Sequence, residues 1–451
     1  MARGTTSATL EKLLKRAEKI TLADLSGGKK KTPTDVTELV ATLLANGIRA
    51  NASAIHIEPR SDGVHIRHRI DGVLTDAQIL PKAIEPILIA GLKILVNLPV
   101  DEAELPQQAS LTINAQSKPY KLRIATVPVE EGEKAVVQLT SLSGKAPSLS
   151  QLGYWGPSLK AIGESLVSAK GIILLAVPHD SGQAETMYSI LSQLNTPGVS
   201  VATVEDPILY RISNTTQVQV NNRIGLGFAA GLKTLLRQDT NVLMVSNVQD
   251  NETATLTVQA ALSGRLLVAG LHAPSSTAAL EYLLASRIEP YLLAHTVKAV
   301  ASQRTVRRLC DNCKQIYTPD EPEMIHILKT LGVKTAAHLQ RVRDLEQQAI
   351  AEKLVVGSSP ASDKGFIGSL YRASKDGCAE CNHTGYKGTI GIHEVMPISE
   401  AIQSLIVSRA TPEVITNQSI QEGNPTLQMD GLVKVILGIT SVDEVMNATQ
   451  A

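Results

Sequence analysis

Four cysteines form the clearest chemical pattern in this sequence of 451 residues. Cys310 and Cys313 make one C-x2-C pair, and Cys378 and Cys381 make a second pair further along the chain. Two such pairs supply four thiolates, which complete the tetrahedral coordination of Zn²⁺ and leave no open position for catalysis. Glycines soon after the second pair permit the tight turn that a zinc knuckle needs. We therefore expect a structural zinc site; the alternative is four unrelated free cysteines.

A second chemical pattern lies between an expected strand and an expected helix, where a phosphate-binding loop belongs. Such a loop follows the pattern G-x-x-x-x-G-K-[ST]. The eight positions here are Val177, Pro178, His179, Asp180, Ser181, Gly182, Gln183 and Ala184. Only the second required glycine, Gly182, is present, so this match by itself does not indicate nucleotide binding.

The elements around these patterns indicate an α/β fold. Helices are expected between four apolar runs of strand length, which favours a parallel sheet covered on both faces. Before them, a helical pattern and several alternating strands predict a small α+β domain. The apolar runs are 171–177, 199–204, 242–245 and 266–271. We expect five parts. They are an N-terminal helix and linker (1–33), the α+β domain (34–145), the parallel-sheet core (146–305), a cysteine-bearing element (306–395) and a helical end (396–451).

The expected N-terminal part combines an amphipathic helix with a basic linker. Leucines and charged residues alternate at helical spacing from Leu10 to Ile20. Two glycines, three lysines (Lys29, Lys30 and Lys31) and a proline then follow as a linker. The lysines could contact an acidic membrane surface or form a solvated turn.

Composition excludes several classes of protein. Basic and acidic residues are equal at 43 each, whereas a protein that grips nucleic-acid backbones needs a basic excess. One Trp, nine Tyr and two Phe are too few for a base-stacking platform. The start has no apolar run typical of a signal peptide, and the longest apolar stretch, 84–100, carries Glu85 and Lys93. We expect a cytoplasmic protein with no nucleic-acid partner, in which disulfides are disfavoured.

Motifs along most of the chain resemble the secretion ATPase family, and within it the assembly motors of type II secretion and type IV pili. The matching stretches, in the family's order, are 55–59, 69–72, 203–207, 225–239, 250–254, 264–272, 303–310 and 430–440. The resemblance runs from about Thr34 to the C-terminus. It implies a RecA-like core of the P-loop NTPase fold, an ATP and Mg²⁺ site, and a hexameric ring.

Against that family the nucleotide site is degenerate. The family's lysine, which meets the β- and γ-phosphates, is Gln183, and its Mg²⁺-binding hydroxyl residue is Ala184. Its first and central glycines are Val177 and Asp180, and Asn247 stands where the family has the carboxylate of Walker B. An amide cannot act as a general base at neutral pH. ATP and Mg²⁺ binding is therefore doubtful.

Other family positions are retained or changed in ways that leave two interpretations open. Glu205, Asp206 and His272 would be catalytic in an intact relative; here we expect them to serve folding, capping or subunit contacts instead. Arg67, Arg69 and Arg123 match arginines that in the family can reach nucleotide, and could also be ordinary surface-pairing residues. Ala54 stands where the family has an Asp in the stretch Ser-Asp-Ile-His. Ser110 and Gln138 stand where the family has two further arginines. The four cysteines match a tetracysteine element of the assembly motors.

The sequence therefore predicts a catalytically degenerate subunit, a pseudo-ATPase, of a pilus or secretion assembly motor. We expect it in a homo- or hetero-hexamer, with an active paralogous ATPase in the mixed case, at the inner-membrane platform. The subunit would then be cytoplasmic and peripheral at the inner face of the membrane. Two alternatives are a working ATPase with a non-standard phosphate loop and a free-standing interaction module.

Overall fold

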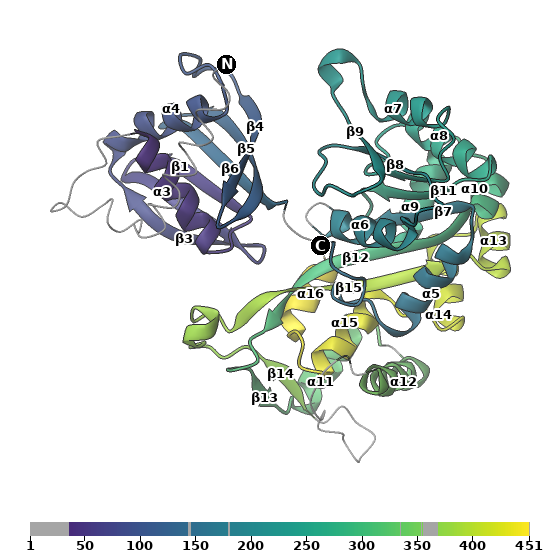
Figure 1. Ribbon diagram of the computed structural model, residues 1–451. Helices are drawn as coiled ribbons and strands as arrows, with labels where there is room; N and C mark the ends of the chain where they lie inside the picture. Colours follow the sequence, from purple (N-terminus) through teal and green to yellow (C-terminus); the bar gives the residue numbers. More distant parts are fainter. Residues whose placement is uncertain are drawn as a thin grey trace. The chain divides into compact units, whose positions relative to one another are not determined.

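The computed structural model describes residues 36–142, 146–178, 181–333, 335–352, 354 and 369–450. The chain divides into two compact units, residues 1–145 and 146–451 (Figure 1). The expected N-terminal helix and linker, residues 1–33, lie outside the described residues. The division of residues 146–451 into three further parts stays a prediction.

The first unit is a six-stranded sheet with helices packed against it. The strand order is β3-β2-β1-β6-β5-β4, and every pair is antiparallel. Alternate residues of these strands, such as Ile55 and Ile57, point into a core shared with the helices, because side chains of a strand alternate between faces. The elements are α3 (Val36–Arg49), β1 (Ala54–Arg60), β2 (Gly63–Ile70), β3 (Val73–Leu80), η1 (Lys82–Ile84), α4 (Glu85–Leu95), β4 (Gln107–Ala115), β5 (Lys118–Val129) and β6 (Gly132–Ser141).

The second unit is built on a seven-stranded sheet in the order β15-β12-β7-β11-β10-β8-β9. All neighbouring strands are parallel except the β12·β15 pair. The central strands are continuous apolar runs, as expected for strands buried on both faces. The strands and the elements between them are β7 (Gly171–Ala176), α6 (Gln183–Leu194), β8 (Val201–Glu205), β9 (Thr215–Gln219), η2 (Asn222–Ile224), α7 (Phe228–Leu235), β10 (Val242–Val245), α8 (Asn251–Leu262), β11 (Leu266–Leu271), α9 (Ser276–Ala285), α10 (Pro290–Thr296), β12 (Val297–Leu309) and β15 (Tyr386–Pro397).

Helices cover both faces of this sheet (Figure 1). Even-numbered residues of β7, such as Leu174, pack with α7, α8, α9 and α10. Odd-numbered residues, such as Ile173 and Leu175, pack with α6 and with α5 (Gly156–Val167) on the other face. This confirms the expected α/β class, with helices on both sides of a mainly parallel sheet.

The cysteine-bearing region and the C-terminal helices share a third core beside β12 and β15. It contains Trp155, Leu345 and Leu432, among others. A buried ion pair ties it together: Lys434 donates to Asp430 at 2.7 Å and to the carbonyls of Gly153 and Gly391. The elements are β13 (Gln315–Tyr317), α11 (Glu321–Thr330), α12 (Ala336–Ala351), β14 (Leu370–Arg372), η3 (Ala379–Cys381), α13 (Glu400–Val407), α14 (Pro412–Gln421), α15 (Leu427–Ile436) and α16 (Val442–Gln450).

The expected helical C-terminal part is confirmed from α13 onward. Within the described ranges, none of the helices is both long and apolar enough to cross a membrane.

Candidate functional site

The parallel sheet brings the family's chemical positions to one edge. Strands β7, β8, β10 and β11 all run in the same direction, so the residues after their carboxyl ends lie at the same border of the sheet. The loop 177–182 follows β7, and Asp206, Asn247 and His272 follow β8, β10 and β11 in turn. This edge is where ligands bind in open α/β sheets, and the described residues that follow these strands lie along it.

The degenerate loop joins β7 to the start of α6. Val177 is fully buried, and its N–H donates to the carbonyl of Leu271 at 3.0 Å, which extends the strand by one residue. Gly182 adopts φ +75°, a left-handed conformation that favours glycine, and α6 begins at the next residue. His179 and Asp180 lie outside the described residues.

Gln183, at the position of the family's lysine, is used for an internal contact. Its side-chain amide donates to the carbonyl of Ser246 at 2.9 Å and so links the loop to the end of β10. The amide lies against Gly270 so closely that a Cβ atom there would come within 1.7 Å of Nε2. The side chain that would meet phosphate in the family therefore binds the protein's own backbone.

Gln303 on β12 holds the loop from the other side, a role that the sequence did not reveal. Its Nε2 donates to the carbonyl of Ser181 at 2.6 Å. Its Oε1 accepts from the hydroxyls of Tyr154 and Thr186 at 3.1 and 2.7 Å. The signal that could have found it is a glutamine inside a long strand, since a buried amide needs several partners.

Glu205 is a buried member of a hydrogen-bond network. It is 1% exposed and accepts from Thr203 at 2.5 Å, from Gln217 at 3.1 Å and from the hydroxyl of Tyr188. Burial raises the pKa of its carboxyl group, while hydrogen bonds from Thr203, Tyr188 and Gln217 oppose that rise. Its oxygens are thus occupied by protein donors, which supports the expected structural role.

Hydrogen bonds also link His272, Asp206 and Arg265 to neighbouring elements of the second unit. The ring Nδ1 of His272 lies 3.3 Å from the carbonyl of Val177, and the N–H of Asp206 donates to the Ser246 hydroxyl at 3.3 Å. Arg265 donates to the carbonyls of Leu236 and Thr240, which follow the end of α7. A cation at a helix C-terminus is stabilised by the helix dipole.

We tested whether this edge suits a Mg²⁺–nucleotide. A phosphate loop supplies a lysine for the terminal phosphates and a hydroxyl for Mg²⁺, and the hydrolytic carboxylate follows a neighbouring strand. The described residues offer the amide of Gln183, the methyl group of Ala184 and the amide of Asn247 instead. This donor set does not fit a Mg²⁺–nucleotide.

The predicted arginines of the first unit lie on its sheet. Arg69, Ala54, Gln138, Arg123 and Ser110 are successive partners across five strands, so their side chains share one face. Arg69 donates to the carbonyl of Gly72 at 2.8 Å, and Arg123 is exposed.

Arg67 lies on β2, as Arg69 does, but its guanidinium group pairs with carboxylates. It contacts Glu58 at 3.4 Å and Asp76 at 3.2 Å. These pairs are what the surface-pairing interpretation expects for Arg67.

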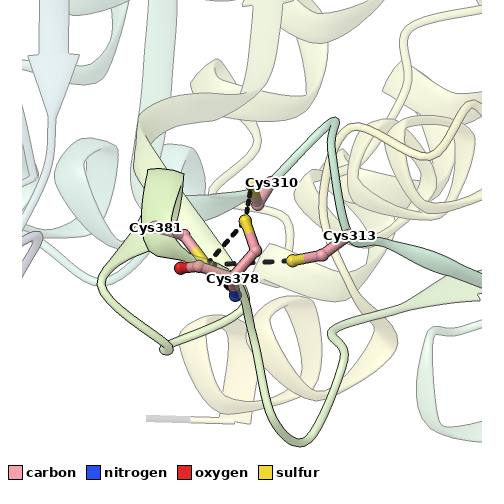
Figure 2. Close-up of side chains that lie close together, drawn as sticks. All are labelled: Cys310, Cys313, Cys378 and Cys381. Atoms are coloured by element: carbon pink, nitrogen blue, oxygen red, sulfur yellow. Dashed lines mark hydrogen bonds between the residues drawn. The ribbon is translucent and has the colours of Figure 1, made fainter.

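The four cysteines meet in one cluster (Figure 2). Cys310 follows β12, Cys313 lies three residues on, Cys378 comes directly before η3, and Cys381 is the last residue of η3. Three of the Sγ–Sγ separations are 3.7, 3.8 and 3.7 Å, and all four sulfurs lie within 4.8 Å of one another. Sulfurs 2.3 Å from a tetrahedral Zn²⁺ are about 3.8 Å apart. The cluster therefore fits Zn²⁺ in both ligand type and spacing.

Backbone donors favour the thiolate form of Cys381. Burial opposes ionisation of Cys381, but N–H groups of Cys378 and Gly385, each 3.2 Å from its Sγ, help to lower the pKa of this thiol to about 6. A thiolate binds metal where a thiol does not. These residues would hold a metal as four sulfur ligands, which closes the site to substrate.

Comparison with known proteins agrees with the resemblance seen in the motifs. The profile of the family described as "Type II/IV secretion system protein" matches residues 29–447. The chain belongs to this type II/IV secretion system protein family. The type II secretion system ATPase E of Vibrio cholerae is 33% identical over 92% of this chain and 75% of its own length. The type IV pilus assembly ATPase PilB of Thermus thermophilus is 33% identical over 91% of this chain and 43% of its own length.

Two solved structures share the fold of this chain. The ATPase DotB of Legionella pneumophila superposes with a TM-score of 0.62 at 16% identity, over 93% of this chain and 96% of its own. The pilus retraction motor PilT, solved with bound ADP, superposes with a TM-score of 0.55 at 16% identity, over 91% and 96%. The expected RecA-like core is therefore confirmed.

Proposed function

We propose that this chain is a catalytically degenerate subunit of a type IV pilus or type II secretion assembly motor. The observation that carries the proposal is the Gln183 amide, which occupies the lysine position and donates to the Ser246 carbonyl at 2.9 Å. A neutral amide engaged in this way offers no positive charge to a terminal phosphate, and electrostatic stabilisation of that charge is the main source of catalysis in phosphoryl transfer.

The surrounding positions support the same proposal. The Mg²⁺ hydroxyl and the hydrolytic carboxylate are replaced by Ala184 and Asn247. Glu205 is buried and accepts from three protein donors. Each of these changes removes or occupies one component of phosphoryl transfer, while the buried strands that would position those components are kept.

The proposed role is structural or regulatory within a ring. Membership of the motor family supports a hexamer of this chain alone or mixed with an active paralogue, acting at an inner-membrane platform from the cytoplasmic side. The four-cysteine cluster supports a structural Zn²⁺ that fixes the cysteine-bearing region against β12.

Phosphate release from ATP tests the proposal against the working ATPase with a non-standard loop. We expect release by the purified, zinc-loaded chain to equal that of a heat-denatured sample, with Mg²⁺ present. Asn247→Ala and His272→Ala should leave this background unchanged. The Thermus thermophilus PilB, assayed in parallel, is the positive control. Turnover above background that either substitution abolishes would establish the working ATPase and overturn the proposal.

A further inference from the structure

An open groove in the first unit has no role in the proposed motor function. It has a volume of about 680 Å³ and lies between α4 and the hairpin that joins β5 to β6. Its apolar wall includes Ile89, Val100 and Val129, and the last two are 44% and 40% exposed. Apolar side chains exposed together around a concavity are typical of a surface that binds a partner.

The groove is also acidic. Glu85, Glu104 and Glu133 line it, and no Lys or Arg is among its lining residues. The buried Lys93 pairs with one oxygen of Glu133 at 2.8 Å. Glu133 is only 8% exposed. Its other oxygen, Oε1, is buried and has no hydrogen-bond partner among the described residues. An unpaired carboxylate oxygen of this kind is costly unless a donor reaches it, so the groove suits a ligand that is apolar and basic.

The chain itself carries a segment of that chemistry. Residues 10–20 place leucines and an isoleucine at helical spacing, which forms one apolar face if the segment is helical. The same eleven residues carry four basic and two acidic side chains, an excess of two positive charges. The basic residues are Lys12, Lys15, Arg16 and Lys19. Their long side chains can reach acidic groups at the rim while the apolar face is buried.

The point at which the described chain begins places this segment within reach. Val36 starts α3 and packs on Gly91 of α4, where a Cβ atom would come within 2.6 Å of Val36 Cγ1. The next residue back along α4, Ala90, lines the groove, so the groove is one helix diameter away, about 10 Å. A linker of about 15 residues spans roughly 20 Å on average. Tethering over such a distance gives an effective concentration in the millimolar range, so a weak contact suffices.

We propose that residues 10–20 dock in the groove formed by α4 and the β5–β6 hairpin of the same chain. The leucines fill the space beside Ile89, Val100 and Val129, and a basic side chain pairs with Glu133. The proposal concerns the first unit alone and holds whether or not the second unit binds nucleotide.

Hydrogen exchange of the full chain tests it. Peptides covering 85–90, 100–105 and 128–133 are compared between the parent and the variant Lys12→Glu/Lys15→Glu/Arg16→Glu/Lys19→Glu. If the segment is docked nine-tenths of the time, exchange of groove amides that open only on undocking is about tenfold slower in the parent. The matched control reverses the linker lysines, Lys29→Glu/Lys30→Glu/Lys31→Glu, and should behave as the parent does.

Two further results separate this occupant from others. The variant Leu13→Asp/Leu14→Asp should lose the same protection, because the apolar face would no longer be buried. Equal exchange in parent and variants would overturn the proposal and leave the groove to an external partner. Protection that rises with protein concentration would also overturn it, since the occupant would then be a second copy of the chain.

Discussion

Removing the metal from the four-cysteine cluster is the perturbation for which the structure gives the most specific expectation. Sulfur separations of 3.7 to 3.8 Å correspond to a metal about 2.3 Å from each sulfur in a tetrahedral site. We therefore expect one Zn²⁺ per chain. X-ray absorption should show a shell of four sulfurs at about 2.3 Å and no nitrogen or oxygen ligand.

Loss of this metal should destabilise the second unit measurably. A ligand that binds only the folded state at 1,000 times its Kd contributes about 4 kcal/mol. For a unit of this size the entropy of unfolding is about 0.6 kcal/mol/K, so this contribution corresponds to a fall in Tm of about 6 °C. The assay is thermal unfolding before and after chelation, with Cys381→Ser as the variant and Ser408→Ala, on the exposed end of α13, as the matched control.

Two results would refute this reasoning. A purified chain with no stoichiometric zinc, or one whose Tm is unchanged by chelation, would mean that the sulfurs are close without binding a metal. A shell of mixed sulfur and nitrogen would mean that a residue other than the four cysteines completes the site.

Three other expectations concern stability. Asp430→Ala should lower the free energy of unfolding by about 3–5 kcal/mol in urea denaturation, because it leaves the buried Lys434 ammonium without its carboxylate; a loss under about 1 kcal/mol would contradict this. Gln183→Ala should cost about 1 kcal/mol by removing the bond to the Ser246 carbonyl, and an unchanged denaturation midpoint would count against that bond. Burial opposes ionisation of Glu58, but Lys134, Arg60 and Arg67 outweigh it and lower the pKa of this carboxyl group to about 2. Its contribution to stability is present above the unfolded pKa, about 4.5, and is lost as pH falls toward 2. The stability gap between the parent and Glu58→Gln should therefore close over that range, and a gap that stays constant would refute the assignment.

The sequence predicted the apolar part of the fold well. The runs 242–245 and 266–271 are β10 and β11 as expected, and the run from 199 became β8. These strands are buried on both faces, so continuous apolar residues are sufficient to predict them. The expected parallel order is also present, and it sets the loop after β7 at the carboxyl edge of the sheet.

Two strands of the second unit, β12 and β15, were not predicted. β12 carries Gln303 and Arg304 and β15 carries His393, all of which are buried. Gln303 is satisfied by Tyr154, Thr186 and the loop, which lie far from it in the sequence. Contacts of this kind form only in the folded chain, so no local pattern reveals them.

The two candidate sites also differ in how far local sequence could predict them. The cluster of four cysteines was predicted because the spacing within each C-x2-C pair is local and its chemistry is specific. The internal bond of Gln183 could not be predicted, since its acceptor belongs to another strand. The sequence could predict which family residues are replaced near this loop, but not what the side chains at those positions bind.

Calorimetric titration of the zinc-loaded chain with ATP, with and without Mg²⁺, tests the central claim most directly. The degenerate-subunit account predicts no heat of binding at millimolar nucleotide in either condition, while the Thermus thermophilus PilB gives a saturable signal. Saturable binding to this chain that requires Mg²⁺ would contradict the account, because Gln183, Ala184 and Asn247 would then have to support the metal–nucleotide complex.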